Sequence, residues 1–172
     1  MTVGSNAPPT FSCTCIAIRA LSADFHHLFN LAVNVEVAKA AHAAGAKTFC
    51  FISGAGIRSW YASWTPYSKM KIGVEDTIKD LGFEQAIIVR PGAIMGDREN
   101  VHQGYPLMAA AINGLGKIHG GFRDALGQDA EVIGRAAVHA LKLAREGKAP
   151  SKYWVLDMAD IVRLGRDEWN LE

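Results

Sequence analysis

The sequence predicts an α/β fold in which helices flank a parallel sheet. Short apolar runs rich in aromatic and β-branched residues alternate with longer segments of helical periodicity, which is typical of this class. The two clearest runs, Lys47–Ser53 and Gln85–Arg90, are mostly apolar, as expected of strands covered on both faces. With 172 residues, 49% hydrophobic and 20% charged, the chain suits one domain over 1–172.

The N-terminal part predicts a strand and then a long helix. Phe, Cys, Ile and Thr dominate Thr10–Ile18, which follows two prolines and is interpreted as a strand. Ser22 or Asp24 can cap a helix. This helix is expected to reach about Ala44, with Gly45 ending it. Apolar residues spaced by three and four predict its buried stripe: Leu28, Leu31, Val35, Ala38 and Ala41.

A second helix is expected to open at Thr65-Pro66, since proline in the first turn sacrifices no helical hydrogen bond. It is expected to end near Leu81-Gly82. The strand Gln85–Arg90 follows, and Pro91–Gly104 is interpreted as a loop. The remaining predicted elements are helices at about Tyr105–Asn113 and from Asp129 or Ala130 to Glu146, a strand at Tyr153–Leu156, and a closing helical segment at Ala159–Arg166.

The most informative local pattern is a tyrosine and a lysine four residues apart. Tyr67 and Lys71 share one face of the second predicted helix. A nearby ammonium lowers the pKa of a tyrosine, which makes the phenol a usable acid or base near neutral pH. The spacing alone also arises by chance on a solvated helix face. Its setting is more specific, because a strand ending in Ser53 precedes it and a strand ending in Pro91-Gly92 follows it.

This order of elements resembles the short-chain dehydrogenases/reductases. Within them it resembles the atypical members that include fungal mitochondrial NAD(P)-binding proteins and the animal Tat-interacting oxidoreductase-like proteins. The resemblance is closest over Phe49–Glu99 and extends loosely over Phe11–Trp169. Asp160–Arg166 resembles the fungal branch in particular. The matching segments are Thr10–Cys13, Ala38–Gly45, Tyr67–Gly73, Val89–Gly92 and Gly96–Glu99.

The resemblance implies an NAD(P)-dependent oxidoreductase that transfers hydride between the cofactor and a carbonyl or alcohol. It assigns Tyr67 as the catalytic acid/base, and Lys71 as its partner and a ligand of the nicotinamide ribose. Ser53 would hydrogen-bond the substrate oxygen, although the family usually has a Ser-Ser pair where this chain has Ser53-Gly54. A strand-end serine that bonds its own backbone is the alternative interpretation.

The same resemblance implies a contact surface for NADP or NAD after the second buried strand. In the family the corresponding loop lies over the nicotinamide. A Pro-Gly pair after a strand is also found in ordinary turns. The cofactor-binding residues implied here are Lys71, Arg90, Pro91, Gly92, Ala93 and Ile94.

The glycine-rich turn that holds a dinucleotide pyrophosphate has no match in the sequence. Only Gly4 and Gly45 precede Lys47, and Ser59 stands where Gly54-Ala55-Gly56 would need a third glycine. We therefore expect a truncated Rossmann-like sheet without its N-terminal βαβαβ half, and weak or no dinucleotide binding. The alternatives are an inactive remnant that binds a partner and a fragment of a longer gene product.

Composition narrows the remaining partners and the location. Eighteen basic and seventeen acidic residues give a net charge of +1, which gives no reason to expect nucleic acid. The scattered histidines and Cys13, Cys15 and Cys50 form no metal-ligand spacing, and buried thiols indicate an intracellular protein. No stretch approaches the ~20 apolar residues of a transmembrane segment. Met1–Pro9 resembles neither a signal peptide nor a presequence.

By resemblance the location is mitochondrial, at the periphery of the outer membrane, and otherwise cytoplasmic. The strand within Thr10–Ile18 corresponds to the interior strand 4 of the order 3-2-1-4-5-6. Without strands 1 to 3 it would be a bare edge, which is a template for pairing with another chain. A homo-oligomer or a partner chain bound through residues 10–18 is therefore expected.

Overall fold

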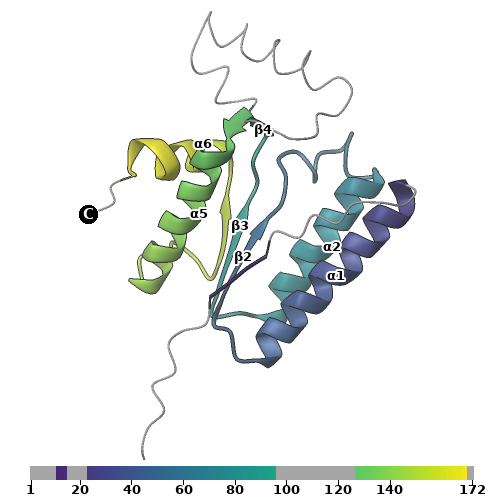
Figure 1. Ribbon diagram of the computed structural model, residues 1–172, viewed down its shortest axis with the longest axis horizontal. Coiled ribbons are helices and arrows are strands. Elements are labelled where there is room, and N and C mark those ends of the chain that lie inside the picture. The colour runs from purple at the N-terminus through teal and green to yellow at the C-terminus, as the bar shows by residue number, and fades with distance from the viewer. Residues whose placement is uncertain (1–10, 15–22, 96–126, 170–172) are drawn as a thin grey trace, which may run out of the picture.

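The computed structural model describes residues 11–14, 23–95 and 127–169 (Figure 1). A four-stranded sheet of order β1-β2-β3-β6, parallel at every pairing, forms its centre. The strands are β1 (Phe11–Thr14), β2 (Thr48–Ile52), β3 (Gln85–Val89) and β6 (Tyr153–Leu156). The predicted parallel α/β architecture is confirmed.

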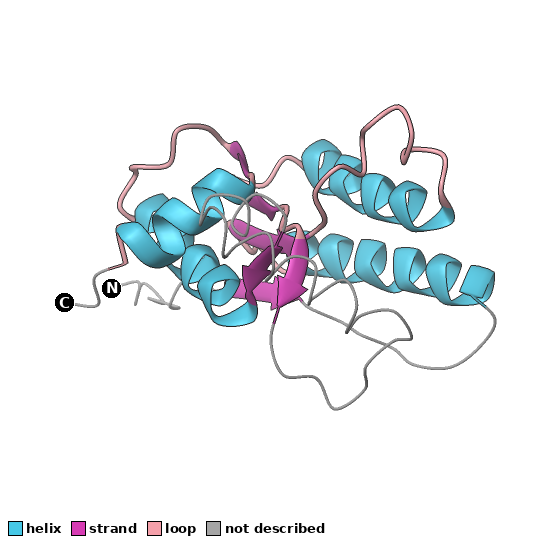
Figure 2. Cartoon of the chain, turned by 90° about the horizontal axis from the view of Figure 1, so that it is seen from above, coloured by secondary structure: helices cyan, strands magenta, loops and turns pink. Residues whose placement is uncertain are grey.

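Helices cover both faces of this sheet (Figure 2). One face carries α1 (Ala23–Ala43) and α2 (Pro66–Leu81), which pack against each other. The other carries α5 (Ala130–Arg145), α6 (Met158–Val162) and the π-helical turn η1 (Arg163–Asp167). In the part of the chain that the structure describes, no helix is both long enough and apolar enough to cross a membrane.

The helix ends follow the local chemistry that the sequence predicted. Thr65 caps α2, because its side chain accepts a hydrogen bond from the Ser68 backbone N–H. Gly82 ends α2 and Gly45 follows the end of α1, both with positive φ, which glycine adopts without a steric penalty. These three positions confirm the predicted helix boundaries to within one or two residues.

Alternation along β2 and β3 fills a core on each side of the sheet. Phe49 and Phe51 pack toward α1 and α2, whereas Cys50 belongs to the core under α5. In β3 the side chains Ala86 and Ile88 join the first core, and Ile87 and Val89 the second. All seven are at most 3% exposed. Burial of each large apolar side chain contributes about 1.5–3 kcal/mol, so this double coverage holds the strand ends firmly in place.

The loop predicted over Pro91–Gly104 is wrong at its start. Ala93–Met95 forms β4, which pairs in parallel with β5 (Gly127–Asp129) as a separate two-stranded sheet. Three residues carry no periodicity, and their pairing partner is distant in the sequence, so no local pattern indicates this strand. The end of the first predicted strand after Thr14, the rest of the predicted loop, and the predicted helix at 105–113 lie outside the described residues.

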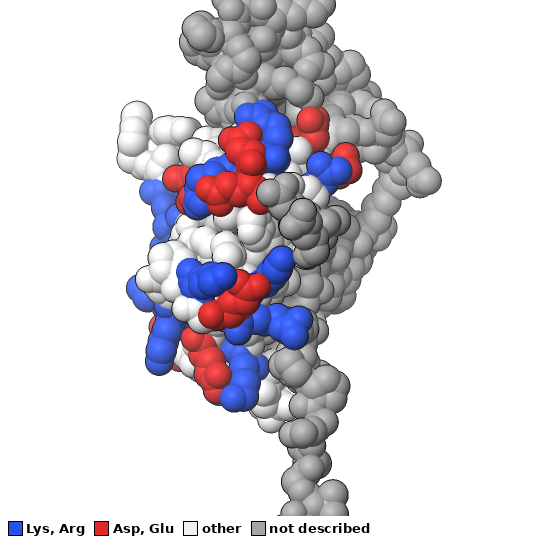
Figure 3. Space-filling view, turned by 90° about the vertical axis from the view of Figure 1, so that its left-hand side faces the viewer, with Lys and Arg blue, Asp and Glu red and all other residues white. Residues whose placement is uncertain are grey.

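Acidic and basic side chains are interspersed on the side of the molecule formed by α5, α6 and η1 (Figure 3). Glu131 and Arg135 pair one helical turn apart, and Arg163 pairs with both Asp160 and Glu168. This mixture agrees with the near-zero net charge of the chain.

Among the described residues, β1 has a strand neighbour only on its β2 side. We expect the 1–172 polypeptide to form a dimer or larger assembly, to aggregate, or to require a partner, because an unpaired strand edge recruits other strands. Light scattering should give a mass above that of one chain, with contacts centred on residues 10–18. A stable monomer that melts cooperatively would contradict this expectation.

Candidate active site

The three predicted catalytic residues lie at the carboxyl ends of β2 and β3. Ser53 and Gly54 follow β2 directly, and α2 carries Tyr67 above them. A Cβ atom built on Gly54 would stand 3.1 Å from the Tyr67 hydroxyl, so the phenol lies almost against the backbone at the strand end. In open parallel sheets, ligands bind in the crevice outside the carboxyl ends of the strands.

The start of α2 fixes where Tyr67 lies. The Thr65 hydroxyl accepts from the Ser68 backbone N–H at 3.2 Å and donates to the Ser68 Oγ at 2.9 Å. Pro66 presets the backbone of the first turn. The phenol therefore extends from a capped helix start, which limits the positions it can take.

Lys71 is anchored at the end of β2. Its Nζ donates a hydrogen bond of 2.9 Å to the backbone carbonyl of Ile52 and lies 4.8 Å from the centre of the Phe51 ring. Ile52 immediately precedes Ser53, so this contact brings the ammonium to the strand end that Tyr67 also reaches. The i,i+4 spacing in the sequence thus corresponds to two groups that converge on one strand end.

The direction expected for the pKa of Tyr67 is wrong. Its side chain is 43% exposed, and partial burial raises its pKa above the ordinary value of 10.0. The sequence predicted a lowered pKa from the neighbouring ammonium, but Lys71 directs its Nζ to the Ile52 carbonyl, and the loss of water around the phenol dominates. Near neutral pH the Tyr67 hydroxyl therefore holds its proton and is suited to donate it.

Ser53 is a buried hydroxyl at the same strand end. It is 4% exposed, and its backbone N–H donates to the Val89 carbonyl at 2.7 Å. Its Oγ has no hydrogen-bond partner within the described residues, so the interpretation that it bonds its own backbone finds no support. A buried hydroxyl left unsatisfied costs about 1–3 kcal/mol, which a ligand oxygen at this position would recover.

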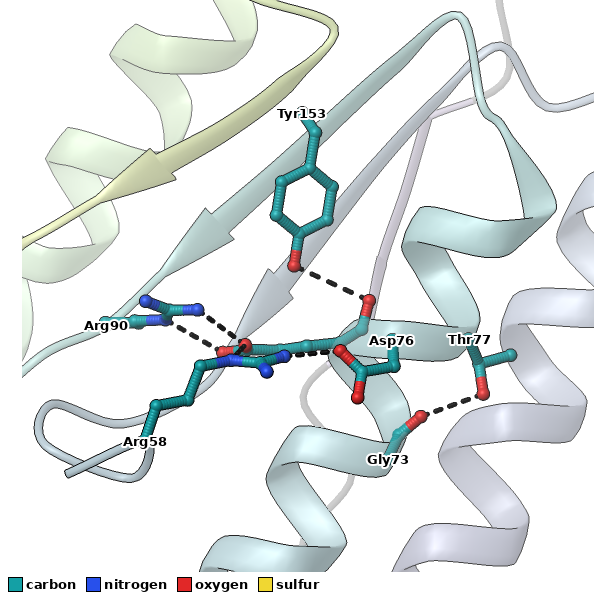
Figure 4. Close-up of polar contacts among 7 residues, drawn as sticks. Arg58, Gly73, Asp76, Thr77, Arg90 and Tyr153 are labelled. Atoms are coloured by element: carbon teal, nitrogen blue, oxygen red, sulfur yellow. Dashed lines mark hydrogen bonds and ion pairs between the residues drawn. The ribbon is translucent and has the colours of Figure 1, made fainter. Parts of the chain in front are cut away.

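Glu75 is the functional candidate that the sequence analysis missed. It is 0% exposed and receives Arg90 through two bonds, Nε to Oε1 at 3.0 Å and Nη2 to Oε2 at 2.6 Å. Arg58 adds a bond from Nε to Oε2 at 3.1 Å, and its Nη2 reaches Asp76 Oδ1 at 2.5 Å (Figure 4). The available signal was its position, one further turn along the face that carries Tyr67 and Lys71.

Burial by itself would raise the pKa of Glu75, but its partners reverse the direction. The hydrogen bonds and charge of Arg90, with the hydrogen bond of Arg58, lower the pKa of this carboxyl below its ordinary value. The Ser53 hydroxyl lies near enough to add to this lowering, although its Oγ lacks the geometry of a hydrogen bond. Glu75 is therefore ionised at neutral pH, and the guanidinium groups of Arg90 and Arg58 compensate its negative charge inside the protein.

The segment expected to contact the nicotinamide is held by backbone bonds. Ala55 donates to the Pro91 carbonyl at 2.7 Å, and the Gly92 N–H donates to the buried Gln128 side chain at 2.8 Å. Ala93 and Ile94 belong to β4. The guanidinium of Arg90, also predicted to bind the cofactor, is directed to Glu75 instead.

The residues present fit the nicotinamide end of a dinucleotide. A protonated phenol, a buried hydroxyl and an ammonium lie at one strand end. For the phosphate end, the described ranges 11–14, 23–95 and 127–169 contain no glycine-rich turn that leads directly into a helix. Gly54-Ala55-Gly56 leads into turns, and the next helix begins only at Pro66.

Three aromatic side chains are exposed on the loop between β2 and α2, which leads into the site. Trp60 is 89% exposed, Tyr61 61% and Trp64 68%. Trp60 and Tyr61 meet edge to face, with 5.8 Å between ring centres. Large exposed aromatic groups next to a site are candidates for contact with a ligand or partner.

The parallel sheet and the site at its carboxyl edge define a Rossmann-type α/β protein. The solved structure of UDP-galactose 4-epimerase shares this fold with a TM-score of 0.57 at 16% identity, over 79% of this chain and 50% of the epimerase. No family model matches the chain.

Curated fungal relatives are much closer in sequence. "Protein FMP52, mitochondrial" of Chaetomium globosum is 62% identical over 138 residues, which are 80% of this chain and 59% of the relative. "Protein fmp52-1, mitochondrial" of Aspergillus terreus is 40% identical over 93% of this chain and 70% of its own length. The chain belongs to the FMP52 family of fungal proteins. It spans 59% of the length of the Chaetomium globosum relative and 57% of that of a relative from Neosartorya fischeri.

The predicted resemblance to the fungal mitochondrial proteins is thereby confirmed. The resemblance to the animal Tat-interacting oxidoreductase-like proteins stays a prediction.

Proposed function

We propose that this chain carries the hydride-transfer end of an NAD(P)-dependent oxidoreductase of the atypical short-chain type. The observation that supports it most is the meeting of Tyr67, Lys71 and Ser53 at the carboxyl end of β2. Catalysis would need a cofactor-binding half in addition, because the pyrophosphate requires backbone donors that the residues described by the structure do not supply.

Each side chain has a distinct role in this proposal. Tyr67 donates its proton to the oxygen of a carbonyl substrate, and its raised pKa keeps that proton available at neutral pH. Ser53 donates its hydroxyl proton to the same oxygen and so polarises the carbonyl. Lys71 acts as a fixed positive charge beside the site. The reduced nicotinamide supplies the hydride when NADPH or NADH is bound.

The proposed cofactor contacts rest on the resemblance to the short-chain dehydrogenases. Lys71 would bond the nicotinamide ribose, and the segment Pro91, Gly92, Ala93 and Ile94 would contact the carboxamide. Arg90 would act through its pair with Glu75, since its guanidinium is already engaged there. NAD and NADP remain equivalent candidates, because no described residue corresponds to the one that selects between them after the second strand of a dinucleotide-binding unit.

The exposed aromatic loop suggests the kind of substrate. A large exposed aromatic surface lies on the loop between β2 and α2 and is formed by Trp60, Tyr61 and Trp64. Pockets for small molecules are lined mainly by such side chains. The proposed substrates are therefore hydrophobic carbonyl compounds or the corresponding alcohols.

The proposed location is mitochondrial, and more narrowly the periphery of the outer membrane. The names of the relatives from Chaetomium globosum and Neurospora crassa, both given as mitochondrial, support the first part. The second part rests on family resemblance alone. Fractionation of mitochondria, with protease added to the intact organelle, tests it.

The second candidate function is a non-catalytic protein that binds a partner. The one-sided pairing of β1 within the described sheet favours it, since such an edge can accept a strand from another chain. In that function Tyr67 and Lys71 would be retained from an enzyme ancestor but would take no part in catalysis.

The decisive experiment measures the transfer of deuterium from a labelled cofactor to a carbonyl substrate. The chain is joined to the unmatched part of the Chaetomium relative and supplied with NADPH or NADH deuterated at C4 of the nicotinamide, together with a panel of hydrophobic ketones and aldehydes. The proposal predicts an alcohol that carries deuterium on the former carbonyl carbon. A folded, dinucleotide-bound hybrid that transfers no deuterium to any member of the panel would favour the partner-binding function.

A further inference from the structure

We infer that Glu75 is the positioning residue of this site: it fastens the two loops that border Tyr67 to the helix that carries Tyr67. This inference rests on the proposed function for its meaning, but its evidence is the contact network alone. Tyr67, Lys71 and Glu75 follow one another at intervals of four, so they line one face of α2 from the strand end inward.

The first fastening acts through Arg58 in the loop after β2. Arg58 bonds Glu75 and Asp76 together, so two neighbouring carboxylates of α2 hold one guanidinium. The preceding residue, Ile57, is 3% exposed, and its Cγ2 would stand 3.5 Å from a Cβ on Gly54. The same Gly54 position is 3.1 Å from the Tyr67 hydroxyl. A shift of Arg58 would therefore reach the phenol through Ile57 and Gly54.

The second fastening acts through Arg90 at the end of β3. Its guanidinium takes both oxygens of Glu75, an arrangement that fixes direction as well as distance. Its backbone N–H donates to the Leu156 carbonyl at 2.9 Å, and Pro91 and Gly92 follow it directly. The turn at the end of β3 is thus tied to the same carboxylate as the loop after β2. Figure 4 shows Arg58 and Arg90 approaching this point from two separate segments.

The charges of the network are balanced. Two guanidinium groups, Arg58 and Arg90, face two carboxylates, Glu75 and Asp76. A fully buried carboxylate needs such partners, and well-packed apolar residues are often at least as stabilising in its place. Stability alone therefore does not account for an ionised group here. Its specific effect is to set where the loop after β2 and the turn after β3 lie relative to Tyr67.

The experiment compares Arg58→Met with Arg135→Met in the full 1–172 chain. Arg58→Met releases the loop but leaves the Arg90 pair on Glu75 intact, so the fold is kept. Arg135→Met is the matched control, because it makes the same substitution but breaks an exposed pair with Glu131 on α5, across the sheet from α2. Tyrosines are labelled with ¹³C at Cζ, and the Tyr67 signal among the four tyrosines is assigned with Tyr67→Phe. Its chemical shift is followed against pH.

Arg58→Met is expected to move the Tyr67 signal and to lower the pKa of Tyr67 toward 10.0, because a released loop lets water reach the phenol. Arg58→Lys should restore part of the shift, and Arg135→Met should leave Tyr67 as in the wild type. A Tyr67 signal and pKa unchanged in Arg58→Met would overturn the inference, even where the melting temperature falls. The NMR signal of Tyr67 can be measured without turnover. The inference about Glu75 is therefore tested independently of the proposed reaction.

Discussion

Replacing Tyr67 with phenylalanine is expected to lower kcat by about 10²–10⁴-fold in the enzyme completed by its cofactor-binding half, because the phenol supplies the proton of the carbonyl reduction. The ring and its packing over Gly54 are kept, so the fold should be unaffected. Steady-state kinetics at saturating substrate, with circular dichroism to establish folding, measure the effect.

Tyr153→Phe is a matched control for this substitution. It also removes one phenol, but that hydroxyl makes only a long bond of 3.5 Å to the Glu75 backbone carbonyl. Its kcat should stay within about twofold of the wild type, far from the loss expected of an acid catalyst. Equal kcat values for Tyr67→Phe and the wild type would remove Tyr67 from the catalytic role.

Glu75→Gln is expected to lower the free energy of unfolding by about 3–5 kcal/mol, since removal of one partner from a buried ion pair leaves the other uncompensated. Arg90 would then keep a positive charge that is only 24% exposed at its side chain. Urea unfolding followed by far-ultraviolet circular dichroism provides the measurement.

Glu131→Gln is the control for the stability prediction. It breaks an exposed i,i+4 pair with Arg135, and such pairs contribute about 0.3–0.5 kcal/mol. The two variants should therefore differ clearly in their unfolding midpoints. Unfolding free energies of Glu75→Gln and Glu131→Gln that agree within error would show that the buried carboxylate contributes no more than a surface one.

The same carboxylate should make the wild type sensitive to acid. The pKa of Glu75 is lower in the folded state than the ~4.3 of an unfolded chain, so the native state binds this proton less readily than the unfolded state. The stabilisation is complete above the unfolded pKa and is lost as the pH falls through the folded pKa. Unfolding free energies of Glu75→Gln should accordingly change less with pH below about 4.3 than those of the wild type.

The fold was predictable because its determinants are local. The apolar runs of β2 and β3 and the caps at Thr65 and Gly82 show in the sequence as composition and spacing. The pairing of β4 with β5 was not predictable in this way. Ala93 pairs with Gly127, and no pattern within a three-residue strand announces so distant a neighbour.

The site residues likewise differ in whether local sequence identifies them. Tyr67 and Lys71 are found by their spacing on one helix, whereas Glu75 gains its meaning only from arginines 17 and 15 residues away in sequence. The direction of the Tyr67 pKa was mispredicted for a related reason. Spacing shows which charge is near, but the loss of water around a phenol depends on packing from other segments.

The most direct test of the central claim compares two ligands on the same 1–172 chain. Reduced nicotinamide mononucleotide and NADH are titrated by NMR, with backbone signals at Ser53, Tyr67 and Lys71 as reporters. If the chain carries only the nicotinamide end of the cofactor site, both ligands should perturb these signals. NADH should then bind no more than a few-fold more tightly than reduced nicotinamide mononucleotide. A micromolar or tighter dissociation constant for NADH or NADPH, or perturbations centred away from the ends of β2 and β3, would contradict it.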